Sequence, residues 1–368
     1  MSTDDYGRWS LFYVFMIISN AISTGPMMTI FARKFFKLEK DNQKMHIYFF
    51  QLFIGIQILS FVIYYTFFSG LSYDILLEIP CLLLSNLYSY LALFLRFKGL
   101  DKKYMYYSFI RLAVFAIFLI VAILVFGEIS YTILMATFLF SHIPSFLKTL
   151  TFLAIQRKTE KGDLQEFLFL GVYGLSTSLV NGMDKFIIVS LGFNLSFLGY
   201  YSFIYALTNA PTIIIEALKK TMNPVMYKEW TNNGKLSRRT MKTIYYIAFA
   251  LLIIQFVLPQ GTYMALKYFN FINPEFVKSD SFFYINILSI GFFFQGIYHF
   301  VNPYYFFYKK SGVLLAMQVA CIIIYGLFIL NLSKEMNYDK FMWLKTVLLM
   351  GITLLCIGGR LKFSKSND

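Results

Sequence analysis

The stretch "LVNGMDKFIIVSLG", residues 179–192, decides the fold of this chain. It belongs to a long apolar run, residues 167–193, in which Asp184 and Lys185 carry the only charges. A helix of that length crosses the ~30 Å hydrocarbon core of a bilayer. Each charge costs roughly a few kcal/mol there unless it is paired or hydrated. The stretch therefore predicts a membrane-spanning helix whose two charges meet partners on other helices, or water in a cavity.

The composition indicates the same class of protein along the whole chain. Of the 368 residues, 58% are hydrophobic and only 14% are charged, whereas a soluble domain carries about 25% charged residues. Mean hydropathy is +0.62. We expect an all-α integral membrane protein, a polytopic bundle of about 11 transmembrane helices with no soluble domain. The expected spans are residues 9–32, 46–68, 75–97, 104–126, 129–154, 166–192, 197–218, 241–259, 282–307, 312–331 and 341–359.

The basic residues alternate between successive loops. Of the 33 Lys and Arg residues, 25 lie in one set of loops and only five in the alternate set. The positive-inside rule places the first set, and with it the C-terminus, in the cytoplasm. The net charge of +14 is therefore mostly a topology signal and gives no reason to expect a nucleic-acid partner. The first set comprises residues 33–44, 96–103, 148–161, 219–242, 309–310 and 360–365.

An internal repeat indicates two pseudo-symmetric lobes. The segments "YGRWSLFYVF" (6–15) and "LGYYSFIYAL" (198–207) share Gly, Ser and Tyr at an offset of 192 residues. Parallel repeats of this kind underlie many transporter folds. We expect an N-terminal lobe at 1–158 with five spans and a C-terminal lobe at 159–368 with six. The mate of 167–193 would precede Met1, so the first lobe is expected to lack its first helix and the native reading frame to begin upstream.

Two segments carry a resemblance to a known family. They are "GLSTSLVNGMDKFIIVSLGFNLSFLGYYSFIYALTNAPTIIIEALKKTMNPVMYKE" (174–229) and "STDDYGRWSLFYVF" (2–15). They resemble the seventh and eighth helices, and the start of the second helix, of the Wzx-type O-antigen flippases. These belong to the multidrug/oligosaccharidyl-lipid/polysaccharide exporter superfamily, whose members usually have twelve or more helices. The resemblance implies a two-lobed transporter in the bacterial inner (plasma) membrane.

The charges of 167–193 border a stripe of small and polar residues. On a helix, Gly171, Gly174, Ser178, Asn181 and Lys185 share one face, and Asp184 borders it. The stripe predicts that Asp184, Lys185 and Asn181 face a polar lumen. The alternative is that the small residues pack helices closely and that Asp184 makes a structural salt bridge.

Weaker candidates for the lumen lie on other spans. Glu216 continues a polar face on residues 201–219. Arg111 and Lys148 either face the lumen or extend to the cytoplasmic interface. Arg33 and Lys34 lie at a cytoplasmic mouth, where they either bind the substrate or only anchor the topology. We expect His46, His142 and His299 to be hydrogen-bonded structural residues. No motif indicates a catalytic residue, a metal site or a cofactor.

Three functions remain open. The resemblance implies a flippase whose substrate is a polyprenyl-diphosphate-linked oligosaccharide for O-antigen or capsule. Its expected partners are membrane lipid, a polysaccharide polymerase and a chain-length regulator. The second function is a multidrug or ion antiporter of the same superfamily. The third is an enzyme, a membrane polymerase or glycosyltransferase, which we do not expect because no sizeable outer loop carries an acid or metal constellation.

Overall fold

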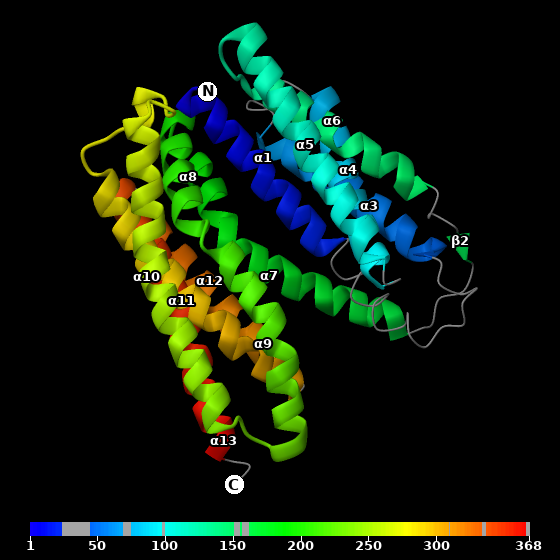
Figure 1. Cartoon of the computed structure of the whole chain (residues 1–368), viewed down its shortest axis with the longest axis vertical. Helices are drawn as coiled ribbons and strands as arrows, with labels where there is room; N and C mark the ends of the chain where they lie inside the picture. Colours follow the sequence, from blue (N-terminus) through cyan, green and yellow to red (C-terminus); the bar gives the residue numbers. More distant parts are fainter. Residues whose placement is uncertain are drawn as a thin grey trace. The chain divides into compact units, whose positions relative to one another are not determined.

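A computed structural model describes residues 1–23, 45–68, 75–97, 100–150, 155–156, 162–308, 310–332 and 336–365. The backbone in these ranges is almost wholly helical, which confirms the expected all-α class (Figure 1). The chain forms two compact units, an N-terminal unit Met1–Phe186 and a C-terminal unit Ile187–Asp368. The lobe boundary predicted between residues 158 and 159 lies outside the described residues.

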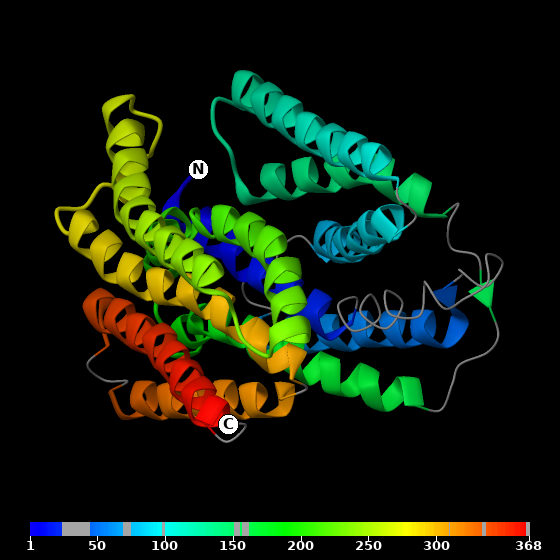
Figure 2. The ribbon, with the colours of Figure 1, turned by 60° about the horizontal axis from the view of Figure 1, so that its bottom comes forward.

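The N-terminal unit consists of helices and one minimal parallel pair of strands, β1 with β2. Figure 2 shows its α5 and α6 as neighbouring helices joined by a short loop. Gly127 ends α5 at a φ of 74°, a left-handed conformation that glycine adopts without strain. The elements are α1 Thr3–Ile22, β1 Met45–His46, α3 Ile47–Phe68, α4 Ile75–Phe97, α5 Asp101–Phe126, α6 Tyr131–Leu150, β2 Ile155–Gln156 and α7 Gly162–Ser190, whose last residues enter the C-terminal unit.

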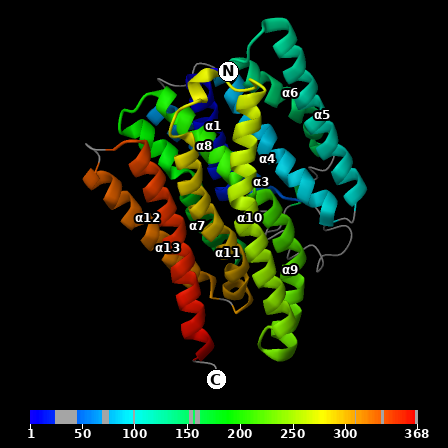
Figure 3. The same cartoon turned by 60° about the vertical axis from the view of Figure 1, so that its left-hand side comes forward.

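The C-terminal unit is built around α11, which packs against α8, α9, α10, α12 and α13. Figure 3 shows α11 between α10 and α13. Sixteen residues of this helix are buried, as its central place requires. The elements are α8 Leu195–Asn209, α9 Thr212–Asn233, α10 Arg238–Tyr268, η3 Pro274–Phe276, α11 Ser281–Phe307, α12 Ser311–Leu332 and α13 Tyr338–Lys365.

The two units share a set of helix neighbours. In the N-terminal unit, α1 packs with α3 and α4, and α4 packs with α5 and α6. In the C-terminal unit, α8 packs with α10 and α11, and α11 packs with α12 and α13. The last two helices of each set, α5 with α6 and α12 with α13, also contact each other. This correspondence confirms the two pseudo-symmetric lobes predicted from the sequence repeat.

The repeat extends to the way its first helices begin. The Ser2 side chain accepts a hydrogen bond from the Asp5 amide and caps α1. The Asn194 side chain accepts one from the Phe197 amide and caps α8. Both residues satisfy an amide that has no partner inside the helix. Ser2 and Asn194 are 192 residues apart, and so are the two residues whose amides they cap, Asp5 and Phe197. This is the offset of the sequence repeat.

A buried glutamine joins the equivalent helices in each unit. In the N-terminal unit, Gln57 of α3 accepts from Ser19 at 2.8 Å and donates to Ser23 at 2.5 Å, both at the end of α1. In the C-terminal unit, Gln255 of α10 donates to the Thr208 carbonyl of α8 at 2.6 Å. Inside a bilayer such polar side chains hold helices together because water is not available as a competing partner.

Five of the described helices are long and apolar enough to cross a membrane: Lys102–Phe126, Arg238–Tyr268, Ser281–Phe307, Ser311–Leu332 and Tyr338–Arg360. The expected span 197–218 was wrong in one respect, because two helices, α8 and α9, share it. They meet at Pro211, which has no N–H to continue the hydrogen-bond ladder. Ala210 and Pro211 keep right-handed helical dihedrals, so the chain bends there without reversing.

Candidate functional site

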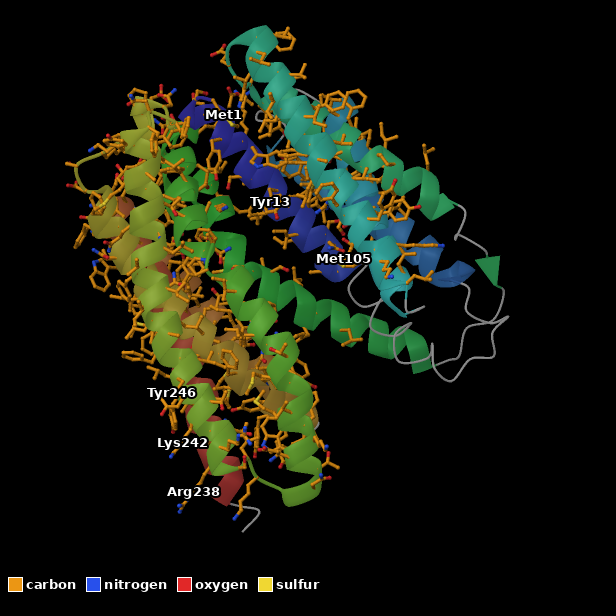
Figure 4. All side chains as sticks on the ribbon, in the orientation of Figure 1. Met1, Tyr13, Met105, Arg238, Lys242 and Tyr246 are labelled. Atoms are coloured by element: carbon orange, nitrogen blue, oxygen red, sulfur yellow. The ribbon has the colours of Figure 1, made fainter. Side chains whose placement is uncertain are left out.

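A cavity of about 320 Å³ lies inside the N-terminal unit. Residues of four helices, α1, α4, α5 and α6, line it. Tyr13 of α1, labelled in Figure 4, and Leu112 of α5 belong to its wall and are 44% and 60% exposed. The cavity therefore reaches the surface of the unit beside these two side chains.

Arg111 supplies the positive charge of the cavity. Its guanidinium carbon lies 4.2 Å from the ring centroid of Tyr88, a cation–π distance. The Tyr88 hydroxyl is held in turn by Ser108, at 2.7 Å. No carboxylate lines the cavity among the residues that the structure describes. The site therefore favours a ligand with negative charge.

His142 lies beside this arginine. Its Nδ1 is 2.8 Å from the Phe138 carbonyl, so this nitrogen carries the proton and donates it. Its Nε2 then serves as an acceptor and faces Arg111 at 3.4 Å. The expectation that His142 is a hydrogen-bonded residue is met, and in addition it lines the cavity.

One wall of the cavity is polar and uncharged. Asn20 donates to Ser89 at 3.5 Å, and its buried Oδ1 has no hydrogen-bond partner among the described residues. Asn86 donates to Gln57 at 2.9 Å, so the glutamine that anchors α1 also fixes this wall. A buried amide oxygen without a partner costs about 1–3 kcal/mol, which a hydroxyl-bearing ligand would recover.

The facing wall is aromatic. The Trp9 ring packs edge-on against Phe138, with centroids 5.4 Å apart, and stacks on Tyr13 at 5.9 Å. Cavities that combine such surfaces with a few placed polar groups are typical ligand sites. The cavity can thus hold a ligand with an anionic group, hydroxyls and flat apolar faces.

The stripe predicted on α7 faces α1 within the N-terminal unit. Lys185 is buried and donates from Nζ to Ser10 Oγ at 2.6 Å. A Cβ added at Gly174 would stand 2.6 Å from the Ala21 carbonyl oxygen, and one added at Gly182 would collide with Val14. Close packing therefore accounts for the small residues on this face.

The other predicted site residues have different outcomes. Asp184 is fully buried on α7, and Asn181 is half-buried one turn earlier. Lys148 lies on α6 and Glu216 on α9, while the description does not extend to their side chains. Arg33 and Lys34 lie outside the described residues. A role in transport stays a prediction for all eight residues.

Sequence reasoning missed two buried charges. Lys345 of α13 is fully buried, with its Nζ 5.2 Å from the Tyr205 ring centroid. The signal was present, because Lys345 is the single charged residue between Phe341 and Gly359. Glu78, near the start of α4, is fully buried and accepts a 2.5 Å hydrogen bond from Tyr131. Nothing in the local sequence shows that Tyr131 covers it.

Comparison with known proteins places the fold. No protein-family profile matches the chain, and no curated protein sequence matches it. The structure is similar to one described as "Inward-facing conformation of a multidrug resistance MATE family transporter of the MOP superfamily". The TM-score is 0.74 at 11% sequence identity, over 99% of this chain and 91% of that chain.

The apolar helices and their repeated arrangement define a multi-pass membrane protein. More particularly, its fold is similar to that of the solved protein described as a MATE family transporter. At this identity the likeness concerns the fold alone. Among the described side chains, no three His, Cys, Asp or Glu residues gather where they would hold a metal ion.

Proposed function

We propose that this protein is a flippase that moves polyprenyl-diphosphate-linked O-antigen or capsule oligosaccharides across the bacterial inner membrane. The observation that carries the proposal is the cavity of the N-terminal unit, which is lined by Arg111, by amide and aromatic side chains, and by no described carboxylate. The transporter fold supports translocation in general. The sequence resemblance supports this substrate class.

The chemistry of the cavity suits each part of such a substrate. A guanidinium pairs with phosphate oxygens through two parallel hydrogen bonds, a geometry that a lysine does not provide. The unpaired Oδ1 of Asn20 is an acceptor for a sugar hydroxyl. Trp9 offers an apolar ring face beside a polar N–H, a combination suited to a sugar ring.

A polyprenyl tail would remain in lipid while the polar head occupies the cavity. The exposed side chains of Tyr13 and Leu112 at the cavity present an aromatic ring and an aliphatic group, which suit a lipid-facing opening. The same proposal includes a cytoplasmic C-terminus, and a polysaccharide polymerase and a chain-length regulator as the proteins that take over the product.

A multidrug or ion antiporter is the second candidate. Two fully buried acids in the N-terminal unit, Glu78 and Asp184, favour it, because a carboxylate inside the membrane can bind the cation that an antiporter transports. The structural neighbour is itself described as a multidrug resistance transporter. Neither acid lines the cavity, which is why we prefer the flippase.

The test uses purified protein in proteoliposomes. Arg111→Gln should lower the translocation of a fluorescent polyprenyl-diphosphate oligosaccharide by ~10-fold or more, since a hydrogen bond to a charged group contributes about 1.5–3 kcal/mol. Arg111→Lys should keep only part of the activity because it lacks the guanidinium fork. Lys103→Gln removes the same charge from an exposed site on the same helix and serves as the control.

The result also separates the two candidates. Efflux of a cationic dye by the wild-type protein, without translocation of the oligosaccharide, would contradict the flippase and favour the antiporter. Equal oligosaccharide translocation by Arg111→Gln and the wild type would show that the cavity does not bind the substrate during translocation.

A further inference from the structure

A cluster of cations and tyrosines lies at one end of the C-terminal unit. Arg360, at the end of α13, places its guanidinium carbon 5.4 Å from the ring centroid of Tyr304 on α11. Tyr245 of α10 and Tyr308, directly after α11, are close enough to interact with it electrostatically. Lys242 stands one turn before Tyr245 and is exposed. The cluster therefore combines three helices around one half-buried arginine.

The tyrosines of the cluster are held by hydrogen bonds and ring contacts. Tyr305 donates to the Cys356 carbonyl of α13 at 2.6 Å, and Tyr308 donates to the Gly234 carbonyl at 3.1 Å. Trp230 packs on Tyr304 with ring centroids 5.8 Å apart. A Cβ added at Gly359 would lie 2.6 Å from the Tyr305 hydroxyl oxygen, so α13 is pressed against α11 directly before Arg360.

Arg360 is half-buried without an anionic partner. No carboxylate lies within ion-pair distance of its guanidinium in the part of the chain that the structure describes. The acid nearest to the start of α10, Glu229, is engaged with Ser237 and Thr240. Exposed cations on α10, among them Arg238 and Lys242 in Figure 4, add positive charge at the same end of the unit.

The apolar surfaces of two helices place this cluster at the membrane interface. On α10, the exposed tyrosines Tyr246 and Tyr268 are about 33 Å apart at ~1.5 Å per residue. On α13, exposed Trp343 lies about 26 Å from Arg360 on the same scale. Both spacings match a ~30 Å hydrocarbon core bounded by aromatic residues. Arg360 and Lys242 therefore lie at the level of the lipid headgroups.

We propose that Arg360, with exposed Lys242 at the same end of the C-terminal unit, binds the headgroup phosphate of an anionic phospholipid such as phosphatidylglycerol. The guanidinium faces phosphate oxygens as a two-pronged donor, and the packed tyrosines hold it in place. The acyl chains of the lipid lie along the exposed apolar face of α10, where Phe249, Ile253 and Val257 follow Tyr246. Such a lipid would fix the height of the C-terminal unit in the membrane.

Native mass spectrometry of the full-length purified protein tests this, with phosphatidylglycerol and phosphatidylcholine as probes. Wild-type protein should bind phosphatidylglycerol more tightly than phosphatidylcholine. Arg360→Gln and, separately, Lys242→Gln should each weaken phosphatidylglycerol binding about five-fold, the factor for one basic residue near an anionic surface. Lys267→Gln, the same change at the other end of α10, should leave it unchanged.

The outcomes separate the proposal from its rivals. Lys242 is exposed, so phosphatidylglycerol binding by Lys242→Gln can be measured even if Arg360→Gln fails to fold. Unaltered phosphatidylglycerol binding in the folded variants, or an equal loss in Lys267→Gln, would overturn the proposal. A third probe, a polyprenyl phosphate, identifies the alternative source of phosphate. If Arg360→Gln weakens only that probe, the site serves the transported lipid instead.

Discussion

The ammonium group of Lys185 donates a 2.6 Å hydrogen bond to the hydroxyl of Ser10, and this bond joins α7 to α1 across 175 residues of sequence. Both side chains are buried. The two glycines Gly174 and Gly182 bring the helices close enough for the bond to form, since a Cβ at either position would meet α1. The packing of α7 against α1 thus determines where the charge of Lys185 lies.

The first prediction concerns the charge of Lys185. Lys185→Ala should leave the protein in the membrane but abolish surface glycan display, while Lys185→Arg should retain part of it because the positive charge remains. Glycan display in a deletion strain, at matched expression, measures the effect. If Ala and wild type complement equally, Lys185 has a packing role only.

The second prediction concerns its acceptor. Ser10→Ala removes the hydroxyl and leaves a buried ammonium group short of one hydrogen bond. We expect a loss of about 1–3 kcal/mol in the free energy of unfolding, seen as a lower melting temperature in detergent. Ser279→Ala, the same change at an exposed hydroxyl, is the comparison variant. An unchanged melting temperature for Ser10→Ala would show that the bond does not stabilise the fold.

The third prediction concerns the α1–α7 contact. Gly174→Ala places a Cβ against the Ala21 carbonyl oxygen, which is backbone and cannot rotate away. Overpacking of this kind costs about 1–3 kcal/mol, so thermal unfolding should begin at lower temperature. Gly326→Ala, inside α12, is the control because nothing lies within 4 Å of its added Cβ. A wild-type melting curve for Gly174→Ala would mean that α7 does not pack on α1 this closely.

The fourth prediction is a pH dependence at the α9–α10 turn. Hydrogen bonds from the Thr240 hydroxyl, at 2.6 Å, and the Ser237 amide, at 2.7 Å, lower the pKa of Glu229 below 4.5. Because the folded pKa is the lower one, the stabilisation is complete above pH 4.5 and is lost as the pH falls through the folded value. Amide hydrogen exchange at residues 237–240, corrected for intrinsic rates, should accelerate below pH 4.5.

The control for this turn is Glu229→Gln, which has no carboxylate to titrate. Its corrected exchange rates should not change with pH and should exceed those of the wild type at neutral pH. Parallel pH profiles for the two proteins would show that Glu229 does not stabilise the start of α10.

The fifth prediction concerns orientation. The excess of basic residues in alternate loops predicts a cytoplasmic C-terminus. A phosphatase that is active only outside the cytoplasm, fused after Asp368, should therefore be inactive, while a fusion in the loop 269–280 should be active. Strong activity from the C-terminal fusion would reverse the whole topology.

Most residues of the candidate site could not be predicted from the sequence. Arg111 was recognised as a charge inside a span, but its approach to Tyr88 and His142 depends on α4 and α6 packing beside α5. Asn20, Trp9 and Asn86 carry no local signal that distinguishes them from other polar and aromatic residues of membrane helices. They become a site because helices distant in sequence enclose one cavity.

The sequence by itself determined the class of this protein, most of its described helical spans and its internal repeat. These follow from local properties, namely the length of the apolar runs and the Gly, Ser and Tyr residues that segments 6–15 and 198–207 share at an offset of 192. Only the tertiary structure decided which buried charge meets which neighbour, as for Lys185 with Ser10 and Glu78 with Tyr131. The physical reason is that hydropathy acts residue by residue along the chain, whereas a charge in hydrocarbon is stabilised by groups that only packing brings within hydrogen-bond distance.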